Sequence, residues 1–271
     1  MSSKPIKKET VFRGLPKRRP VSEKKKTPKK WDIAIRSSTR EPTSIYKCRV
    51  EDLPIYGKKC FGTMCWYGPP ASGKTTLMSD VVENMIKPLR ENRAGDDDIK
   101  VVVLFCPGER PEFQSLKTTR GFVHVKDGFA AKLHRIMQDQ ERMNQRGIKR
   151  KLLLLWDDLF GLVNMNSKEY REICNTLGAK ARQPETNIVW AIASQYPRFL
   201  STGVRSNTHM SFFSNVSPDH IKMILSVQNS HIKPDSLYRI AHSHQFVAVD
   251  NLSNKVYLTK ADVSTPEEAK A

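Results

Sequence analysis

The most constraining feature of this 271-residue sequence is the run Gly-Pro-Pro-Ala-Ser-Gly-Lys-Thr from Gly68 to Thr75. It has the required residue at every fixed position of the pattern G-x-x-x-x-G-K-[ST]. Glycines let the backbone curl so that its N–H groups face phosphate oxygens, and the dipole of a following helix adds positive potential. The run therefore predicts a phosphate-binding loop. The alternative is a glycine turn that carries a lysine by chance.

The segments on either side of the loop favour nucleotide binding. Residues 61–67 form a short apolar and aromatic run typical of a strand. Residues 75–89 carry apolar side chains at helical spacing, and we expect Pro88 to mark the end of that helix. In this context Lys74 should reach the β and γ phosphates of ATP, and the Thr75 hydroxyl should ligate Mg²⁺. The residues expected to contact the nucleotide are Gly68, Pro69, Pro70, Ala71, Ser72, Gly73, Lys74, Thr75 and Thr76.

Further along the chain, apolar runs alternate with helical patterns. Residues 100–105, 152–156 and 187–193 are largely uninterrupted apolar segments, as in strands that are buried on both faces. Residues 130–145 and 168–181 have the spacing of helices. The alternation predicts an α/β fold, namely the mostly parallel sheet of a P-loop NTPase with helices on both faces.

Charge divides the chain into parts. The formal net charge is +18, and residues 1–50 hold sixteen Lys and Arg against four Asp and Glu. Residues 1–44 contain too little apolar surface to offset the entropy of ordering, so we expect a disordered basic arm there. Residues 45–215 should form the ATPase core. Residues 216–271 should form its small C-terminal extension, with two short helices and a terminal hairpin.

The arm contains two basic clusters, Lys17-Arg18-Arg19-Pro20 and residues 24–30. Two such clusters across a short spacer resemble a bipartite nuclear-localisation signal, and they would suit phosphate contacts on DNA equally well. A strongly basic balance predicts a polyanionic partner, of which nucleic acid is the commonest. A solvated sorting tail is the alternative.

The sequence also indicates where the protein resides. Its longest apolar runs, such as residues 101–106, are too short to cross a bilayer, and residues 1–8 lack the apolar centre of a secretory signal. We therefore expect an intracellular protein, nuclear or cytoplasmic, with no membrane partner. The odd number of cysteines and the absence of a Cys-x-x-Cys pair predict reduced thiols at Cys48, Cys60, Cys65, Cys106 and Cys174.

Two carboxylates follow the apolar run 152–156. A strand that ends in an acid places the carboxylate at the carboxyl edge of the sheet, beside the phosphate loop. Asp157 is therefore expected to hold Mg²⁺ together with Thr75, and Asp158 is expected to polarise the attacking water. The alternative for both aspartates is capping of a helix after the strand.

The strand expected at 187–193 is followed by Ser194-Gln195. A polar side chain at that strand end can contact the γ-phosphate or the water that attacks it, and Gln195 is our candidate; a surface amide is the alternative. An arginine from a neighbouring subunit could complete the site. Arg182, Arg198 and Arg205 are the candidates, and their spacing does not rank them.

Taken together, these motifs resemble the genome-packaging ATPases of large DNA viruses, in the FtsK/HerA branch of P-loop motors, and most of all the poxvirus type. The resemblance covers roughly residues 60–215. It rests on the phosphate loop, Asp157-Asp158 and Ser194-Gln195, followed by Tyr196-Pro197-Arg198-Phe199-Leu200 and Val204-Arg205-Ser206-Asn207.

The resemblance implies a ring of subunits that moves double-stranded DNA into a preformed capsid at the expense of ATP. It also implies a host nuclear or cytoplasmic location or association with the virion, and a capsid or portal partner. Gln195 would be the sensor, and Arg205 and Asn207 would form the Arg-x-Asn motif. Two features depart from the family: Asp158 stands where many such motors have Glu, and the basic arm is not part of the family core.

Three other functions remain as alternatives. A replication helicase or initiator ATPase usually brings an added domain, for which residues 216–271 are short. A non-motor protein that binds DNA in a nucleotide-dependent way would not need Lys74, Thr75 and Asp157 together. A small-molecule kinase has little use for a basic arm.

Overall fold

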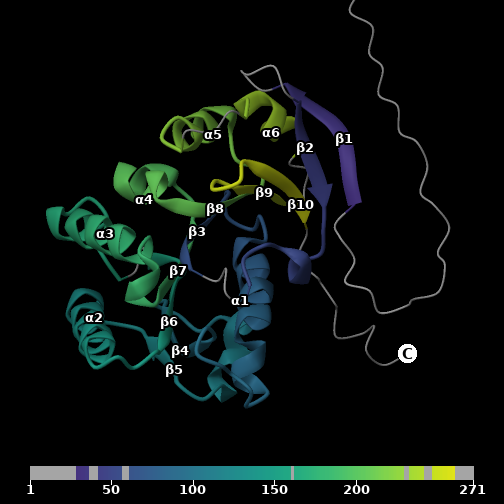
Figure 1. Cartoon of the computed structure of the whole chain (residues 1–271). Helices are drawn as coiled ribbons and strands as arrows, with labels where there is room; N and C mark the ends of the chain where they lie inside the picture. Colours follow the sequence, from purple (N-terminus) through teal and green to yellow (C-terminus); the bar gives the residue numbers. More distant parts are fainter. Residues whose placement is uncertain are drawn as a thin grey trace, which may run out of the picture.

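The computed structural model describes residues 29–36, 42–56, 61–159, 162–228, 232–240 and 246–259. Within these ranges a single sheet of ten strands crosses the protein in the order β1-β2-β10-β9-β8-β3-β7-β6-β4-β5 (Figure 1). The neighbours from β8 to β5 all run parallel to one another. Strand β9 is antiparallel to both β8 and β10. The expected α/β fold with a mostly parallel sheet is confirmed.

The bounds of the elements are as follows. The strands are β1 (Lys29–Arg36), β2 (Pro42–Lys47), β3 (Gly62–Tyr67), β4 (Ile99–Phe105), β5 (Phe122–Val125), β6 (Lys151–Trp156), β7 (Ile188–Ser194), β8 (Thr208–Phe213), β9 (Phe246–Asp250) and β10 (Lys255–Thr259). The α-helices are α1 (Lys74–Arg90), α2 (Phe129–Gln145), α3 (Lys168–Ala181), α4 (Thr202–Ser206), α5 (Pro218–Leu225) and α6 (Pro234–Ile240). Short 3₁₀ helices include η1 (Val50–Asp52), η3 (Pro111–Thr118), η5 (Pro184–Thr186) and η6 (Pro197–Phe199).

The central strands are buried on both faces, which explains why their sequences are apolar throughout. In β6, Leu152, Leu154 and Trp156 belong to one apolar core. The alternate residues Leu153 and Leu155 belong to a second core on the opposite face. Successive side chains of a strand point to opposite faces, so a continuous apolar run supplies both cores at once.

Helices cover the two faces unequally. Helix α1 lies against one face, where its apolar stripe packs with η1 and η3, whereas α2 and α3 cover the other face (Figure 1). Three tryptophans, Trp66, Trp156 and Trp190, are fully buried. Trp156 and Trp190 meet edge to face with ring centroids 4.5 Å apart on the α3 side. The two rings thus pack β6 against β7 near the centre of the sheet. The carboxyl ends of these two strands lie at the candidate active site described below.

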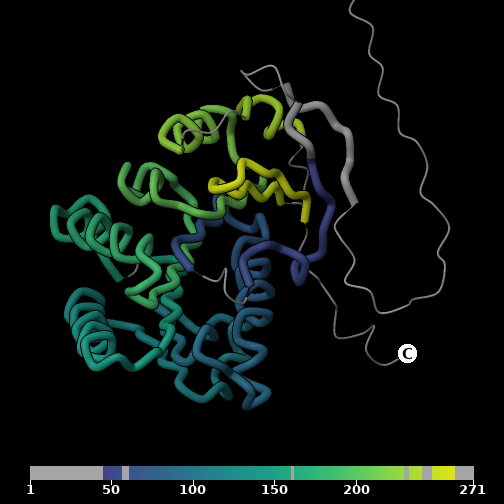
Figure 2. Tube along the Cα trace, in the orientation of Figure 1, coloured from purple at the N-terminus to yellow at the C-terminus, as the bar shows by residue number. Residues whose placement is uncertain are grey.

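The N-terminal strands differ from the expectation for residues 1–44. Strand β2 runs parallel to β10, so that the purple and yellow segments of the tube lie side by side (Figure 2), and β1 pairs with β2. The sheet thus extends into the range expected to be disordered. The alternating apolar residues Trp31, Ile33 and Ile35 are a strand pattern that the high lysine content obscures. Residues 1–28, with the first basic cluster and most of the second, lie outside the described residues.

Other elements agree with the sequence or differ in detail. The helix of 168–181, the two short helices after Pro218 and the hairpin β9–β10 are confirmed. Pro88 does not end α1, which continues to Arg90. Strands β5 and β8 were not expected. None of the described helices is long and apolar enough to cross a membrane. Four thiols, Cys48, Cys65, Cys106 and Cys174, are free, whereas Cys60 lies outside the described residues.

Candidate active site

The phosphate-binding loop lies between β3 and α1, as the sequence predicts. A Cβ atom on Gly68 would come within 2.5 Å of both the Ser214 carbonyl oxygen and the Ser72 hydroxyl. Gly73 has φ of 79° in the left-handed region and precedes the first residue of α1. Both positions therefore require glycine. No side chain caps the start of α1, which leaves its amino end facing the site.

Ser214, at the end of β8, hydrogen-bonds to the phosphate-binding loop and to the end of β3. The Ser214 N–H donates to the Tyr67 carbonyl at 3.0 Å. The Ser214 hydroxyl donates to the Ser72 carbonyl at 3.3 Å. Because Ser214 directly follows β8, the position of the loop depends on a strand that the sequence pattern did not reveal.

Lys74 is buried and directed back along the loop. Its ammonium group donates to the Pro69 carbonyl at 2.5 Å and to the Ser72 hydroxyl at 3.3 Å. Burial lowers the Lys74 pKa to about 8, and the nearby Asp157 and Asp158 carboxylates oppose that shift. A partly desolvated cation that is held only by neutral acceptors is well suited to exchange them for negatively charged phosphate oxygens.

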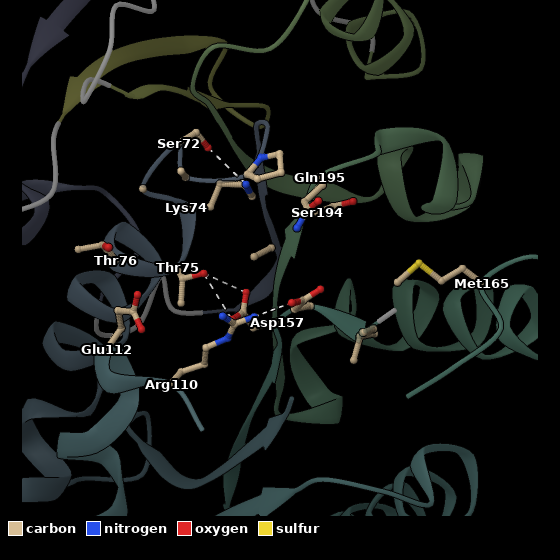
Figure 3. A pocket seen from close by; sticks show the side chains of 16 residues that line it. Ser72, Lys74, Thr75, Thr76, Arg110, Glu112, Asp157, Met165, Ser194 and Gln195 are labelled. Atoms are coloured by element: carbon tan, nitrogen blue, oxygen red, sulfur yellow. Dashed lines mark hydrogen bonds and ion pairs between the residues drawn. The ribbon is translucent and has the colours of Figure 1, made fainter. Parts of the chain in front are cut away.

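Thr75 and Asp157 meet as the sequence predicts. The Thr75 hydroxyl donates to Asp157, at 3.1 Å from Oδ1 and 3.4 Å from Oδ2 (Figure 3). Asp157 is only 3% exposed. Burial raises the pKa of the Asp157 carboxyl to about 6, and Arg110 and the Thr75 hydroxyl oppose the shift.

Asp158 does not stand free beside Asp157, because Arg110 holds it. The Arg110 guanidinium donates through Nη2 to Asp158 Oδ2 at 2.5 Å, and its Nε lies 3.4 Å from Asp157 Oδ2. Asp158 has φ of 51°, a left-handed conformation that costs a residue other than glycine about 1 kcal/mol. The sequence reasoning missed Arg110, which follows β4 by five residues. Four residues, including the charged Glu109, separate Arg110 from the end of β4, so its place in the sequence does not mark it as a strand-end residue as it does Asp157 and Gln195.

The order of the strands explains how these residues come together. Strands β3, β7, β6 and β4 are adjacent and parallel, so their carboxyl ends share one edge of the sheet. The loop follows β3, Gln195 follows β7, Asp157 follows β6 and Arg110 follows β4. Ligands of open α/β sheets bind at this edge.

A cavity of about 410 Å³ opens at that edge. Seven of the nine expected nucleotide contacts line it, from Pro70 to Thr76. Gly68 is buried beneath the loop, and Pro69 contributes the carbonyl that Lys74 contacts. The other lining residues are Arg110, Glu112, Asp157, Asp158, Leu159, Met165, Ala193, Ser194 and Gln195. Ser194 and Gln195 enter the cavity from the side of β7 (Figure 3).

Arg205 is buried, unlike the other two arginine candidates. It is 9% exposed, and its guanidinium donates to the Leu200 carbonyl at 3.2 Å, the Met223 carbonyl at 3.2 Å and the Thr202 hydroxyl at 3.3 Å. These bonds tie α4 to α5 and hold the guanidinium within the subunit. The sequence motif did not reveal this, because burial of Arg205 depends on the packing of α5. Arg182 and Arg198 are exposed, and Arg182 donates to Asn207 at 3.3 Å.

The donor set suits Mg²⁺ bound together with a nucleotide. The described residues contain no group of three or more His, Cys, Asp or Glu side chains able to hold a metal alone. Mg²⁺ usually takes one or two protein oxygens and completes its shell with phosphate and water. The Thr75 hydroxyl and the Asp157 carboxylate, already in contact, fit this requirement.

The raised Asp157 pKa predicts a stability effect in the metal-free protein. The folded protein holds this proton more tightly than the unfolded chain, since the pKa rises from 3.8 to about 6. Ionised Asp157 therefore costs stability at pH 7.5, and the cost fades as the pH falls toward 4. Asp157→Asn should stabilise the protein by roughly 1–3 kcal/mol at pH 7.5 in EDTA, and by about half as much at pH 5. Urea unfolding measures this, with the exposed Asp97→Asn as control. Equal gains at both pH values would contradict the assignment.

Solved structures with the same fold were found, whereas no protein-family model and no curated protein sequence matches the chain. The DNA-packaging ATPase B204 from Sulfolobus Turreted Icosahedral Virus superposes with a TM-score of 0.53 at 14% identity, covering 73% of this chain and 97% of that one. The genome packaging NTPase B204 from Sulfolobus turreted icosahedral virus 2, in complex with AMPPCP, gives a TM-score of 0.51 at 14% identity, covering 74% and 97%.

The Type VII Secretion ATPase EccC of Thermomonospora curvata has a similar fold. The structure of Thermomonospora curvata EccC (ATPases 2 and 3) gives a TM-score of 0.56 at 12% identity, covering 81% of this chain and 38% of that chain. At these identities the likeness concerns the fold. The chain thus has the P-loop NTPase fold, with the phosphate loop, Asp157 and Gln195 at one edge of its sheet.

Proposed function

We propose that this protein is a Mg²⁺-dependent ATPase that moves double-stranded DNA, most specifically a motor that packages viral DNA into a capsid. The observation that supports hydrolysis most strongly is the cavity that joins Lys74, the Thr75–Asp157 pair and Gln195. Packaging is supported by the sequence resemblance and by the two B204 structures, which are described as packaging enzymes.

The residues of the cavity have distinct roles in the proposed reaction. The loop N–H groups and Lys74 bind the phosphates, and Thr75 and Asp157 hold Mg²⁺, which when bound neutralises phosphate charge. A bond forms between the water oxygen and the γ-phosphorus as the bond from that phosphorus to the bridging oxygen breaks. The electron pair of that bond leaves with ADP. Asp158 accepts the proton of the water, and the Gln195 amide orients the water.

The N-terminal segment is proposed to bind DNA. Residues 1–28 carry ten Lys and Arg against two Asp and Glu. Deleting them should weaken binding to double-stranded DNA at least about tenfold at 0.1 M salt and flatten the salt dependence, because fewer counterions are released. Fluorescence anisotropy across a salt series measures both quantities. The deletion ends before β1, so the sheet stays complete. If affinity and slope stay unchanged, the segment is a sorting or docking tail.

The active assembly is proposed to be a homo-oligomeric ring that meets a capsid or portal protein. The exposed Arg182 and Arg198 are the candidates for a residue that reaches a neighbouring site. The proposed location is the host nucleus or cytoplasm, or the virion.

Release of phosphate tests the enzymatic part of the proposal. The protein with ATP and Mg²⁺ should release inorganic phosphate to water, and EDTA should stop the release. Transfer of the γ-phosphate to a nucleoside or sugar acceptor would instead indicate the kinase alternative. Tight ATP binding without release would indicate a non-catalytic DNA-binding protein.

A further inference from the structure

Arg110 is the one positively charged side chain lining the cavity to which the proposed reaction assigns no role. It follows β4 on the loop Cys106-Pro107-Gly108-Glu109-Arg110 and immediately precedes η3. The residues on either side of Arg110 anchor the loop at this end. Glu109 pairs with Lys117 and with Lys126, and Pro111 begins η3. The side chain of Arg110, 35% exposed, reaches from this anchored loop into the cavity (Figure 3).

The Arg110 guanidinium spans both carboxylates of the site. Nη2 lies 2.5 Å from Asp158, and Nε lies 3.4 Å from Asp157 without the alignment of a hydrogen bond. Nε is buried and has no hydrogen-bond acceptor, although the Cys106 thiol lies near the guanidinium. A buried donor without an acceptor costs free energy that a suitable ligand atom would recover.

The two carboxylates that Arg110 contacts are those that the proposed reaction needs. Asp157 must face Mg²⁺, and Asp158 must be free to accept a proton from water. In the structure Arg110 occupies one oxygen of Asp158 and lies against Asp157. Arg110 must therefore give up these contacts before hydrolysis. Phosphate oxygens are the acceptors in this cavity that match a planar guanidinium best.

We infer that Arg110 binds the terminal phosphate of the bound nucleoside triphosphate and, by moving there, releases Asp158 to act as the base. This inference rests on the proposed function, because it concerns the same site. Asp158 is then held by its own chain until a triphosphate is bound. A nucleoside diphosphate has no γ-phosphate, so its binding leaves the Arg110–Asp158 pair in place. Arg110 then adds a second positive charge to that of Lys74 at the γ-phosphate, and both charges come from within the subunit.

Comparison of triphosphate and diphosphate binding tests the inference directly. Arg110→Ala should weaken the binding of AMPPCP about 10- to 100-fold and leave ADP affinity within about twofold, since a charge-assisted contact to one phosphate is lost. Arg110→Lys should restore part of the loss, because lysine keeps the charge but not the planar pair of donors. Arg120→Ala, which removes an exposed arginine outside the cavity, is the control. Calorimetry measures all four proteins with both ligands.

A purely structural role of Arg110 gives a different result. If Arg110 only neutralises the two aspartates, Arg110→Ala should change AMPPCP and ADP affinity by the same factor, and this outcome overturns the inference. A second measurement uses the pair itself. Arg110→Ala and Asp158→Asn form a double-mutant cycle, in which urea unfolding gives the coupling free energy between the two side chains. This coupling should be present in the free protein and disappear with saturating AMPPCP. Coupling that persists with AMPPCP also overturns it.

Neither measurement requires turnover, so failures of the two proposals are distinguishable. A wild-type protein that hydrolyses no ATP, but whose Arg110→Ala variant loses the preference for AMPPCP, contradicts the proposed hydrolysis and supports the role of Arg110. Normal hydrolysis with equal losses for both ligands supports the enzyme and contradicts the role of Arg110.

Discussion

Replacing Lys74 with alanine is expected to lower the rate of ATP hydrolysis at least about a hundredfold, the scale of losing one charged donor to the transition state. Lys74 lies at the start of α1 with its ammonium group inside the phosphate loop. Its present acceptors are a carbonyl and a hydroxyl, so no ion pair is broken on substitution. Phosphate release with ATP and Mg²⁺ measures the effect.

Two controls separate this loss from unfolding and from loss of DNA binding. Lys87→Ala removes an exposed lysine from the same helix and should leave the rate within about twofold. DNA affinity of Lys74→Ala should match the wild type, because the basic segment of residues 1–28 is unchanged. Unchanged turnover in Lys74→Ala would refute the assignment of the nucleotide site.

The second large effect is expected at Asp157. Asp157→Asn should reduce Mg²⁺-dependent hydrolysis about a hundredfold or more, because an amide is a weaker ligand for a hard cation than a carboxylate. Raising the Mg²⁺ concentration should recover only part of the rate. ATP binding in EDTA should be nearly unchanged, since the loop and Lys74 remain. Initial rates across a Mg²⁺ titration provide the measurement.

The same substitution is expected to stabilise the metal-free protein, so its effects on stability and on activity have opposite signs. The shared cause is the burial of a carboxylate that is 3% exposed. Sites tuned to bind a cation retain such a cost when the cation is absent. If Asp157→Asn hydrolysed ATP at the wild-type rate, the metal would have to be held elsewhere.

The central half of the fold was predictable because its strands are buried on both faces. An uninterrupted run such as Leu152–Trp156 is rare outside such strands, and Asp157 directly after it indicates the edge of the sheet. Strand β8 was missed because its sequence, Thr-His-Met-Ser-Phe-Phe, mixes polar and apolar residues. Two of its polar residues, Thr208 and Ser211, are buried with specific partners; the Thr208 hydroxyl, for example, donates to the Val204 carbonyl at 2.9 Å.

The candidate site was predictable where strand ends carry the signal. Thr75, Asp157 and Gln195 each follow an element that the sequence indicates clearly. Arg110 was missed because its partners lie 47 and 48 residues away and meet it only through the pairing of β4 with β6. The burial of Arg205 was not predictable, since its local motif contains no information about the contact with α5.

Stimulation of hydrolysis by DNA is the most direct test of the proposed motor. The rate of phosphate release should be measured with and without long double-stranded DNA, with sedimentation of the same samples to report assembly. We expect a ring whose rate of phosphate release rises severalfold with double-stranded DNA, and a Lys74→Ala protein with no rate to stimulate. A monomer that hydrolyses ATP at the same rate with or without DNA would contradict the proposed motor.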